Sequence, residues 1–310
     1  MKIAMLRREG DYALALAGEE GQVALLRDLA GFADLAPAIR SALEQPADNR
    51  WLLPDVQTAL TKLVQGATER FQSVPPGWRL APPVPRPGKI IAVGRNYMDH
   101  VREGQELWAK RGKVVNIPEF PSAFAKYPSS LSAHGDPIRI PAGHDDIDYE
   151  VELAVVIGSP ALNVGEADAL AHVAGYTICN DVGARGIQRR EMEAQIGIVK
   201  AKNFPGFAPM GPWLVTADDI PDPQALEVKL AVDGDVRQQA STSDMIFTVA
   251  RLISYWSSMG LEPGDIIITG TPSGVALARP EPEKFYLRPG QTATASIGSI
   301  GALVNPVVAG

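Results

Sequence analysis

The chain has 310 residues, of which 45% are hydrophobic and 21% are charged, and its formal net charge is −7. This composition is typical of a globular protein, and the length allows one large domain or two. An acidic chain without a basic run argues against nucleic acid as a partner. No apolar run approaches the roughly 18 residues that a membrane span needs, so we expect no membrane partner. Cys179 is the only cysteine, which excludes a disulfide framework and leads us to expect a cytoplasmic protein.

Residues 1–80 are predicted to form a small α/β N-terminal domain. Apolar runs at 2–6 and 12–16 flank a polar turn, as in a β-hairpin. Apolar residues at helical spacing over 35–43 and 56–64 predict two helices, the second beginning near Pro54. The stretch 75–88 is rich in proline and predicts a stiff, extended linker that forms no regular ladder. We therefore place a boundary there and assign 81–310 to a second, larger domain.

Residues 81–310 contain many short apolar runs between turn residues, which predicts a mainly β structure with a few short helices. Strands are expected at 89–94, 149–158, 175–181, 226–230, 265–269, 293–297 and 302–307, and helices near His100, at 165–173 and at about 243–257. Residues 104–122 are mixed in character and are expected to be loop-like.

Two glutamates, Glu150 and Glu152, open the apolar strand at 149–158. Residues i and i+2 of a strand point to the same face, so both carboxylates lie side by side. A third carboxylate, Asp181, follows the next apolar strand, and three converging oxygen ligands suit a hard ion such as Mg²⁺ or Mn²⁺. The alternative is that both glutamates lie on the solvent face of a half-exposed strand, and spacing alone favours that alternative.

A second cluster follows Asp181. If residues 181–188 form a helix, Asp181, Arg185 and Gln188 lie at i, i+4 and i+7 on one face. An acid, a guanidinium and an amide on one face can bind a carboxylated ligand. The alternative is an ordinary surface pair of Asp181 and Arg185, which contributes little to stability.

A histidine and a glutamate, His100 and Glu103, lie at i and i+3 of a predicted helix. A carboxylate on one imidazole nitrogen fixes the tautomer and raises the basicity of the other nitrogen, as in a general base. The alternative is a surface pair. The glycines before this helix lack the spacing of either nucleotide fingerprint, and no organic cofactor is expected.

Two lysines and a threonine are further candidates. Lys202 and Lys126 each stand among apolar and turn-forming residues, although an exposed lysine is the commoner case. Thr271 follows the predicted strand at 265–269 in a turn-rich segment, where its hydroxyl can meet a ligand carboxylate or simply form a turn.

Taken together, these segments resemble the fumarylacetoacetate hydrolase family, in its bacterial two-domain type. The resemblance covers 89–307 and rests on ordered motifs at 93–100, 135–138, 148–158, 180–188, 207–213 and 264–275. It implies an α+β, mainly β fold, a mixed β-sandwich roll with short helices preceded by the small N-terminal domain. It also implies a homodimer with one Mg²⁺ or Mn²⁺ per subunit.

The resemblance also implies roles for individual residues. The implied metal ligands are Glu150, Glu152 and Asp181, and the implied catalytic residues are His100, Glu103 and Lys202, with His100 and Glu103 on a lid. The implied substrate-binding residues are Arg95, Tyr97, Lys126, Arg185, Gln188 and Thr271. The chain after His100 is longer and more polar than in compact relatives, with Trp108, Lys110, Arg111 and Lys113. That difference predicts a larger or more anionic substrate, or a lid that orders only with ligand.

The implied activity is that of a metal-dependent hydrolase. It would cleave a C–C bond of a small-molecule 2,4-diketo acid, an acylpyruvate or a fumarylacetoacetate-like compound, in catabolism. One alternative is an isomerase or decarboxylase of a 2-keto or 2-hydroxymuconate-type acid on the same scaffold. The other is a binding protein without catalysis, which the His100–Glu103 pair argues against.

Overall fold

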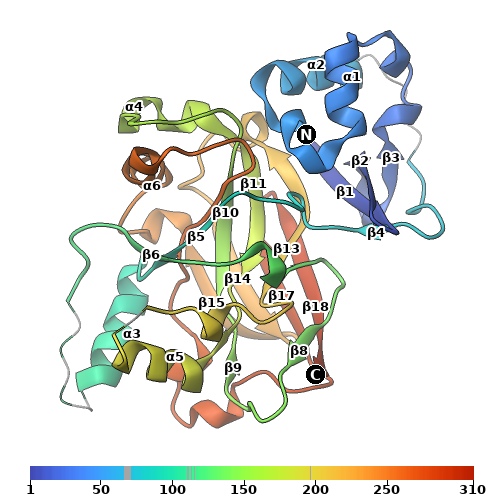
Figure 1. Ribbon diagram of the computed structural model, residues 1–310. Helices are drawn as coiled ribbons and strands as arrows, with labels where there is room; N and C mark the ends of the chain where they lie inside the picture. Colours follow the sequence, from blue (N-terminus) through green and yellow to red (C-terminus); the bar gives the residue numbers. More distant parts are fainter. Residues whose placement is uncertain (66–70, 110–111, 113, 115, 196) are drawn as a thin grey trace.

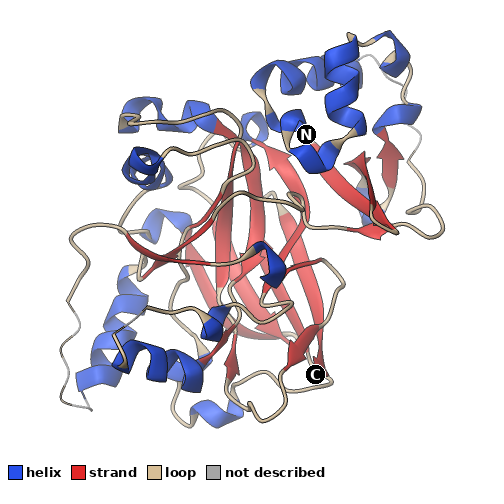
Figure 2. Cartoon of the chain, viewed as in Figure 1, coloured by secondary structure: helices blue, strands red, loops and turns tan. Residues whose placement is uncertain are grey.

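The structure is a computed structural model that describes residues 1–65, 71–109, 112, 114, 116–195 and 197–310. Strands fill the centre of the molecule and short helices lie at its periphery (Figure 2). The strands are β1 Lys2–Arg8, β2 Asp11–Ala17, β3 Val23–Leu25, β4 Arg79–Leu80, β5 Ile90–Gly94, β6 Ser122–Ala125, β7 Leu131–Ala133, β8 Ile138–Ile140, β9 Ile147–Asp148, β10 Val151–Ile157, β11 Val173–Asn180, β12 Gly183–Ala184, β13 Ala208–Thr216, β14 Glu227–Val232, β15 Asp235–Ser241, β16 Ile266–Ile268, β17 Thr292–Ile297 and β18 Gly301–Ala309. The α-helices are α1 Pro37–Glu44, α2 Pro54–Gln65, α3 Met98–Ala109, α4 Glu166–Ala169, α5 Arg185–Glu193 and α6 Val249–Trp256.

Two large sheets carry the fold (Figure 1). The larger has the order β3-β2-β1-β13-β11-β10-β16-β5-β6, with β4 paired to β1 and β7 paired to β13. The smaller has the order β15-β14-β17-β18-β8, and β9 pairs with β12 separately. Most pairs are antiparallel, while β7 with β13, β5 with β16 and β8 with β18 are parallel. This mixed, mainly β arrangement with short helices confirms the predicted fold class.

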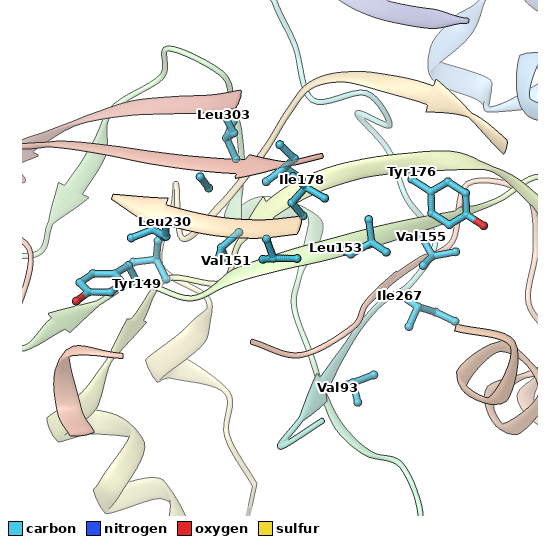
Figure 3. Close-up of a cluster of buried hydrophobic side chains, with 14 of the residues drawn as sticks. Val93, Tyr149, Val151, Leu153, Val155, Tyr176, Ile178, Leu230, Ile267 and Leu303 are labelled. Carbon is cyan, nitrogen blue, oxygen red and sulfur yellow. The ribbon is translucent and has the colours of Figure 1, made fainter. Parts of the chain in front are cut away.

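The central strand β10 is buried along its whole length. Its side chains alternate between two cores, as the period of a strand requires. Val151, Leu153 and Val155 belong to one core with Leu230 and Leu303 of the smaller sheet, and Val155 lies beside Tyr176 of β11 (Figure 3). Of the intervening residues, Ala154 and Val156 face a second core, described next, and Glu152 is also buried, so neither face of β10 is open to solvent.

The second core joins the N-terminal region to the larger sheet. Ala154 and Val156 of β10 belong to the same buried cluster as Ile3, Trp51 and Leu60. The predicted hairpin of β1 and β2 is confirmed, and so are the two helices α1 and α2. β1 pairs antiparallel with β13, so residues 1–80 extend the same sheet that carries β10 and β11. The division into two domains at residue 80 stays a prediction.

The proline-rich stretch differs from the expectation of a linker without a ladder. Within it, β4 pairs with β1, and the Ala81 amide donates to the Met5 carbonyl at 2.8 Å. Ala81 and Val84 are fully buried. The prolines stand beside these pairing positions rather than at them, so a short ladder forms in spite of the composition.

Other element boundaries also needed correction. α3 extends to Ala109, so the first third of the segment expected to be loop-like is helical. α6 begins only at Val249, where the Thr248 hydroxyl accepts the Arg251 amide as an N-cap, and the strand β15 was not expected. Lys110, Arg111 and Lys113 lie outside the described residues. Among the described residues, none of the helices is long and apolar enough to cross a membrane.

Candidate active site

Three carboxylates meet where β10 and β11 lie side by side. Glu152 is opposite Cys179 in the antiparallel register, and this brings Asp181, just past β11, next to Glu150 and Glu152. The three residues each offer an oxygen, and these oxygens lie within 4.8 Å of one another. The exposed fractions are 7%, 2% and 1% for Glu150, Glu152 and Asp181. The alternative of a solvated strand face is therefore wrong.

Two lysines approach this cluster from within the protein. The Lys202 ammonium contacts the Glu150 carboxylate and donates to Asp181 Oδ2 at 2.9 Å. The Lys126 ammonium donates to Asp181 Oδ1 at 2.6 Å and to the Lys202 carbonyl at 2.6 Å. Both lysines are buried, with exposed fractions of 2% for Lys126 and 1% for Lys202. The alternative of exposed, solvated lysines is wrong for both.

Arg185 is the third cation at this cluster. The local structure around it differs from the expected helix. Asp181 and Val182 precede β12, and the helix α5 begins only at Arg185, so Asp181 is not on the same helix as Gln188. A short strand and a helix start bring the three side chains together instead. Arg185 donates to Glu150 Oε1 at 2.6 Å and to Gln188 Oε1 at 2.8 Å.

Asp148 holds Arg185 in this position, and the sequence analysis did not single it out. Its carboxylate accepts the Arg185 Nε at 2.8 Å, the Ala276 amide at 2.8 Å and the Leu277 amide at 3.0 Å. Asp148 is fully buried. Its place two residues before Glu150 was the only available signal, because the partner amides are distant in sequence.

The charges of the cluster do not balance. Four buried carboxylates (Asp148, Glu150, Glu152, Asp181) face three buried cations (Lys126, Arg185, Lys202), which leaves one negative charge in excess.

The excess negative charge affects the ionisation of Glu152. It accepts the Gly270 amide at 2.6 Å, and no ion pair among the described residues involves it. Burial, followed by the charges of Asp181 and Glu150, raises its pKa well above the usual range. Burial opposes ionisation of Glu150 too, yet Arg185 and Lys202 hold its pKa below the usual range. An all-oxygen cluster with surplus negative charge fits a divalent metal ion.

His100 and Glu103 face the cluster from α3. His100 Nδ1 lies 3.4 Å from Glu103 Oε2, while Glu103 Oε1 accepts the Gly274 amide at 2.8 Å. Gly274 has a φ of +103°, and a Cβ there would collide with the Arg237 carbonyl oxygen, so only glycine suits this position. The predicted pairing is confirmed in geometry, and one carboxylate oxygen is anchored while the other orients the imidazole.

One cavity of about 680 Å³ joins these groups. Of the residues that the sequence analysis singled out, ten line it: Arg95, His100, Glu103, Glu150, Glu152, Asp181, Arg185, Gln188, Lys202 and Thr271. Tyr97 and Lys126 are buried and are not among its lining residues. The Thr271 hydroxyl donates to the Val151 carbonyl at 3.0 Å and accepts Gln238 Nε2 at 2.8 Å, so its bonds serve the fold as well.

The family model described as fumarylacetoacetate (FAA) hydrolase C-terminal matches residues 89–308. The chain belongs to the fumarylacetoacetate hydrolase family. The resemblance drawn from the motifs is thereby confirmed, and this family member is an enzyme with a buried acidic cluster that fits a divalent metal ion.

Relatives of this fumarylacetoacetate hydrolase family member differ in their reactions. A mitochondrial oxaloacetate tautomerase of Xenopus laevis is 40% identical over 74% of this chain and 68% of its own. A 5-carboxymethyl-2-hydroxymuconate delta-isomerase of Mycobacterium smegmatis superposes with a TM-score of 0.71 at 30% identity over all of both chains. A maleylpyruvate hydrolase of Sphingobium sp., solved with manganese and pyruvate, has a TM-score of 0.73 at 28% identity over all of both chains.

Proposed function

We propose that this protein is a metal-dependent hydrolase that cleaves the C–C bond of a 2,4-diketo acid of the acylpyruvate type. One observation carries the proposal: the His100–Glu103 pair and the acidic cluster line the same cavity. A positioned base beside a site for a divalent ion is the combination that water-dependent cleavage of a diketone needs. The relative solved with manganese and pyruvate, a maleylpyruvate hydrolase, supports it.

Glu150, Glu152 and Asp181 would hold Mg²⁺ or Mn²⁺, one ion per subunit. The bound ion supplies Lewis-acid stabilisation of negative charge on the 2-oxo oxygen. With a divalent ion, the excess charge of the cluster changes from −1 to +1, which one substrate carboxylate neutralises. Each terminal nitrogen of Arg185 carries two hydrogens, and each has one bond to protein, so hydrogens remain for that carboxylate.

His100 would act as the general base. Glu103 accepts a hydrogen bond from the protonated Nδ1 of His100, and the unprotonated Nε2 then takes a proton from water. The resulting hydroxide adds to the 4-oxo carbon, the C3–C4 bond breaks, and its electron pair moves onto C3 and the 2-oxo group. Return of the proton from His100 to C3 gives pyruvate and a carboxylic acid. Lys202, next to Glu150 and Asp181, adds positive charge near the developing oxyanion.

An isomerase, tautomerase or decarboxylase on the same scaffold is the alternative. It is favoured by the tautomerase and isomerase relatives, which match the chain over most of its length. In such a reaction His100 would move a proton between carbon and oxygen, or carbon dioxide would leave, and no water would be consumed.

Product analysis separates these reactions. Acetylpyruvate, oxaloacetate and 2-hydroxymuconate-type acids should be incubated with the protein and Mn²⁺ or Mg²⁺, and the products identified by mass. We expect acetylpyruvate to yield pyruvate and acetate, with activity lost in Glu150→Ala. An unchanged carbon count for every consumed substrate would establish isomerisation instead, and release of carbon dioxide would establish decarboxylation.

From the family resemblance we further propose a homodimer. Sedimentation of the metal-loaded protein tests it, since a species of one chain mass at micromolar concentration would contradict the proposal.

A further inference from the structure

The acidic cluster and the cations Arg185 and Lys202 form the ionic floor of the cavity, and part of the wall above this floor is apolar. The side chains that form this apolar wall are Phe124, Met192, Ile198, Val199, Val275 and Leu277. They come from three separate segments: β6, the end of α5 with the residues after it, and the loop around 275–278. Met192 and Val199 are 46% and 43% exposed. Large apolar side chains that stay exposed at the rim of a cavity indicate a binding surface.

The apolar wall follows the ionic floor in a fixed direction along α5. Arg185 contacts Glu150 at the start of the helix, Gln188 follows one turn later, and Met192 lies seven residues on. At 1.5 Å per residue, Met192 is about 10 Å along the helix axis from Arg185. Along the face of α5 that Arg185, Gln188 and Met192 share, the lining therefore changes from a guanidinium to an amide to a thioether with distance from the acidic cluster.

The floor and the wall are also built as one rigid unit. The Phe124 ring centre lies 5.5 Å from the Lys202 ammonium. The Leu277 amide donates to Asp148, the same carboxylate that holds Arg185. These contacts fix the distance between the floor and the apolar wall, so a ligand bound at the floor meets the wall at a fixed position along its length.

We propose that this wall is a subsite for an apolar distal group, so the substrates are acylpyruvates with a hydrocarbon acyl chain. The inference rests on the proposed function, which puts the 1-carboxylate and 2-oxo groups at the floor. From C1 to C5 an extended 2,4-diketo acid spans roughly 5 Å. The acyl chain beyond C5 then reaches the apolar wall, which buries it.

Two arginines, Arg95 and Arg189, also line the cavity and are the natural partners of a distal carboxylate. No ion pair among the described residues involves either one. However, Glu193 lies four residues after Arg189 on α5 and lines the cavity as well. A carboxylate one turn away on the same helix disfavours a second anion beside Arg189. Glu193 thus offsets the charge of Arg189, and a pair of ligands that differ only in a terminal methyl or carboxylate tests whether Arg189 or Arg95 binds a distal carboxylate.

Unbranched 2-oxo acids test the subsite by binding alone, because they lack the 4-oxo group and are not cleaved. Titration calorimetry on the Mn²⁺-loaded protein should show affinity rising from 2-oxopentanoate, which ends at C5, to 2-oxooctanoate, whose last three carbons reach the wall. The expected gain is about three- to fourfold per methylene, which corresponds to burial of one CH₂ group. 2-Oxooctanoate and 2-oxooctanedioate form a matched pair that differs in the terminal methyl and carboxylate at C8, and 2-oxooctanoate should bind more tightly.

Met192→Gln should reduce the affinity for 2-oxooctanoate several-fold and leave that for pyruvate unchanged. Met259→Gln is the matched control, because Met259 is 58% exposed and does not line the cavity. Equal affinities along the series, or tighter binding of 2-oxooctanedioate than of 2-oxooctanoate, would overturn the inference. Failure of the proposed hydrolysis is a different result, in which the series binds as expected and acylpyruvates are not cleaved.

Discussion

Asp148 Oδ2 accepts the Nε hydrogen of Arg185 at 2.8 Å, and both side chains are almost completely buried. Arg185 in turn contacts Glu150, so an anion outside the acidic cluster fixes a cation inside it. Asp148 also accepts backbone amides from Ala276 and Leu277 on the far wall. One buried carboxylate thus connects the floor of the cavity with its apolar wall.

Replacement of the Asp148 carboxylate should lower the free energy of unfolding. In Asp148→Asn the amide presents one acceptor to four donors, namely Arg185 Nε and the amides of Tyr149, Ala276 and Leu277. Breaking a buried ion pair in this way costs about 3–5 kcal/mol. Urea unfolding monitored by circular dichroism measures it, with the exposed Asp168→Asn as a control of near-zero effect. A loss below about 1 kcal/mol would show that the pair is dispensable.

The surplus charge at Glu152 predicts an unusual response to metal. In the wild type, saturating Mn²⁺ at 100 times its Kd adds about 2.7 kcal/mol, which raises the Tm of a chain of 310 residues by roughly 4 °C. Glu152→Gln relieves the repulsion from Glu150 and Asp181, so the metal-free Tm should stay level or rise. The Mn²⁺-dependent increase should disappear.

Differential scanning fluorimetry with and without chelator measures both effects. The exposed Glu44→Gln provides the control and should keep the full Mn²⁺ response. If the Tm of Glu152→Gln still rises by several degrees with Mn²⁺, Glu152 is not a metal ligand.

The His100–Glu103 pair should affect turnover without affecting metal binding. Loss of a general base typically lowers kcat by 10²–10⁴-fold, and we expect this for His100→Asn on acetylpyruvate. Glu103→Gln keeps an acceptor for the Gly274 amide and loses only the carboxylate behind the imidazole, so a smaller loss of about tenfold is expected. Calorimetry should give the wild-type Mn²⁺ affinity in both variants. Full turnover in His100→Asn would assign the proton transfer to another group.

The metal-type cluster could be predicted from sequence because its geometry is local to two strands. Glu150 and Glu152 share a face by strand period, and β11 returns antiparallel to bring Asp181 beside them. The burial of the two glutamates could not be predicted, since it depends on Arg185, Lys202 and the Gly270 amide, which are distant in sequence. For the same reason, spacing alone favoured the solvated alternative.

The contacts that orient Glu103, and Asp148 behind Arg185, could not be predicted for a related reason. They are made by backbone amides of Gly274, Ala276 and Leu277, and a backbone amide has no side-chain signature. The helix expected from Asp181 onward failed because β12 pairs with β9 first, at Gly183 with Asp148. Long-range pairing overrode a helical spacing that was correct only from Arg185 onward.

His134 should make stability depend on pH. Burial lowers the pKa of its imidazole below the usual value of about 6.5, and its Nδ1 accepts the Val304 amide at 3.2 Å. The unfolded chain therefore binds the proton more readily, so stability falls as pH drops below about 6.5. Urea unfolding of the Mn²⁺-loaded protein at pH 7.5 and 5.5 should show a smaller decrease for His134→Gln than for the wild type. Equal decreases would mean that other groups account for the change.

The shared core predicts that residues 81–310 do not fold stably without residues 1–80. Removing 1–80 strips the edge of β13 of its partner β1 and uncovers Val156, Leu214 and Ile266, which pack against the N-terminal region. We expect the 81–310 fragment to aggregate, and the full chain to unfold in a single transition by both circular dichroism and tryptophan fluorescence. Arg7→Ala removes only the partly exposed ion pair with Asp136 and should cost no more than about 1 kcal/mol. A soluble 81–310 fragment with wild-type Mn²⁺ affinity would instead establish two independently folding domains.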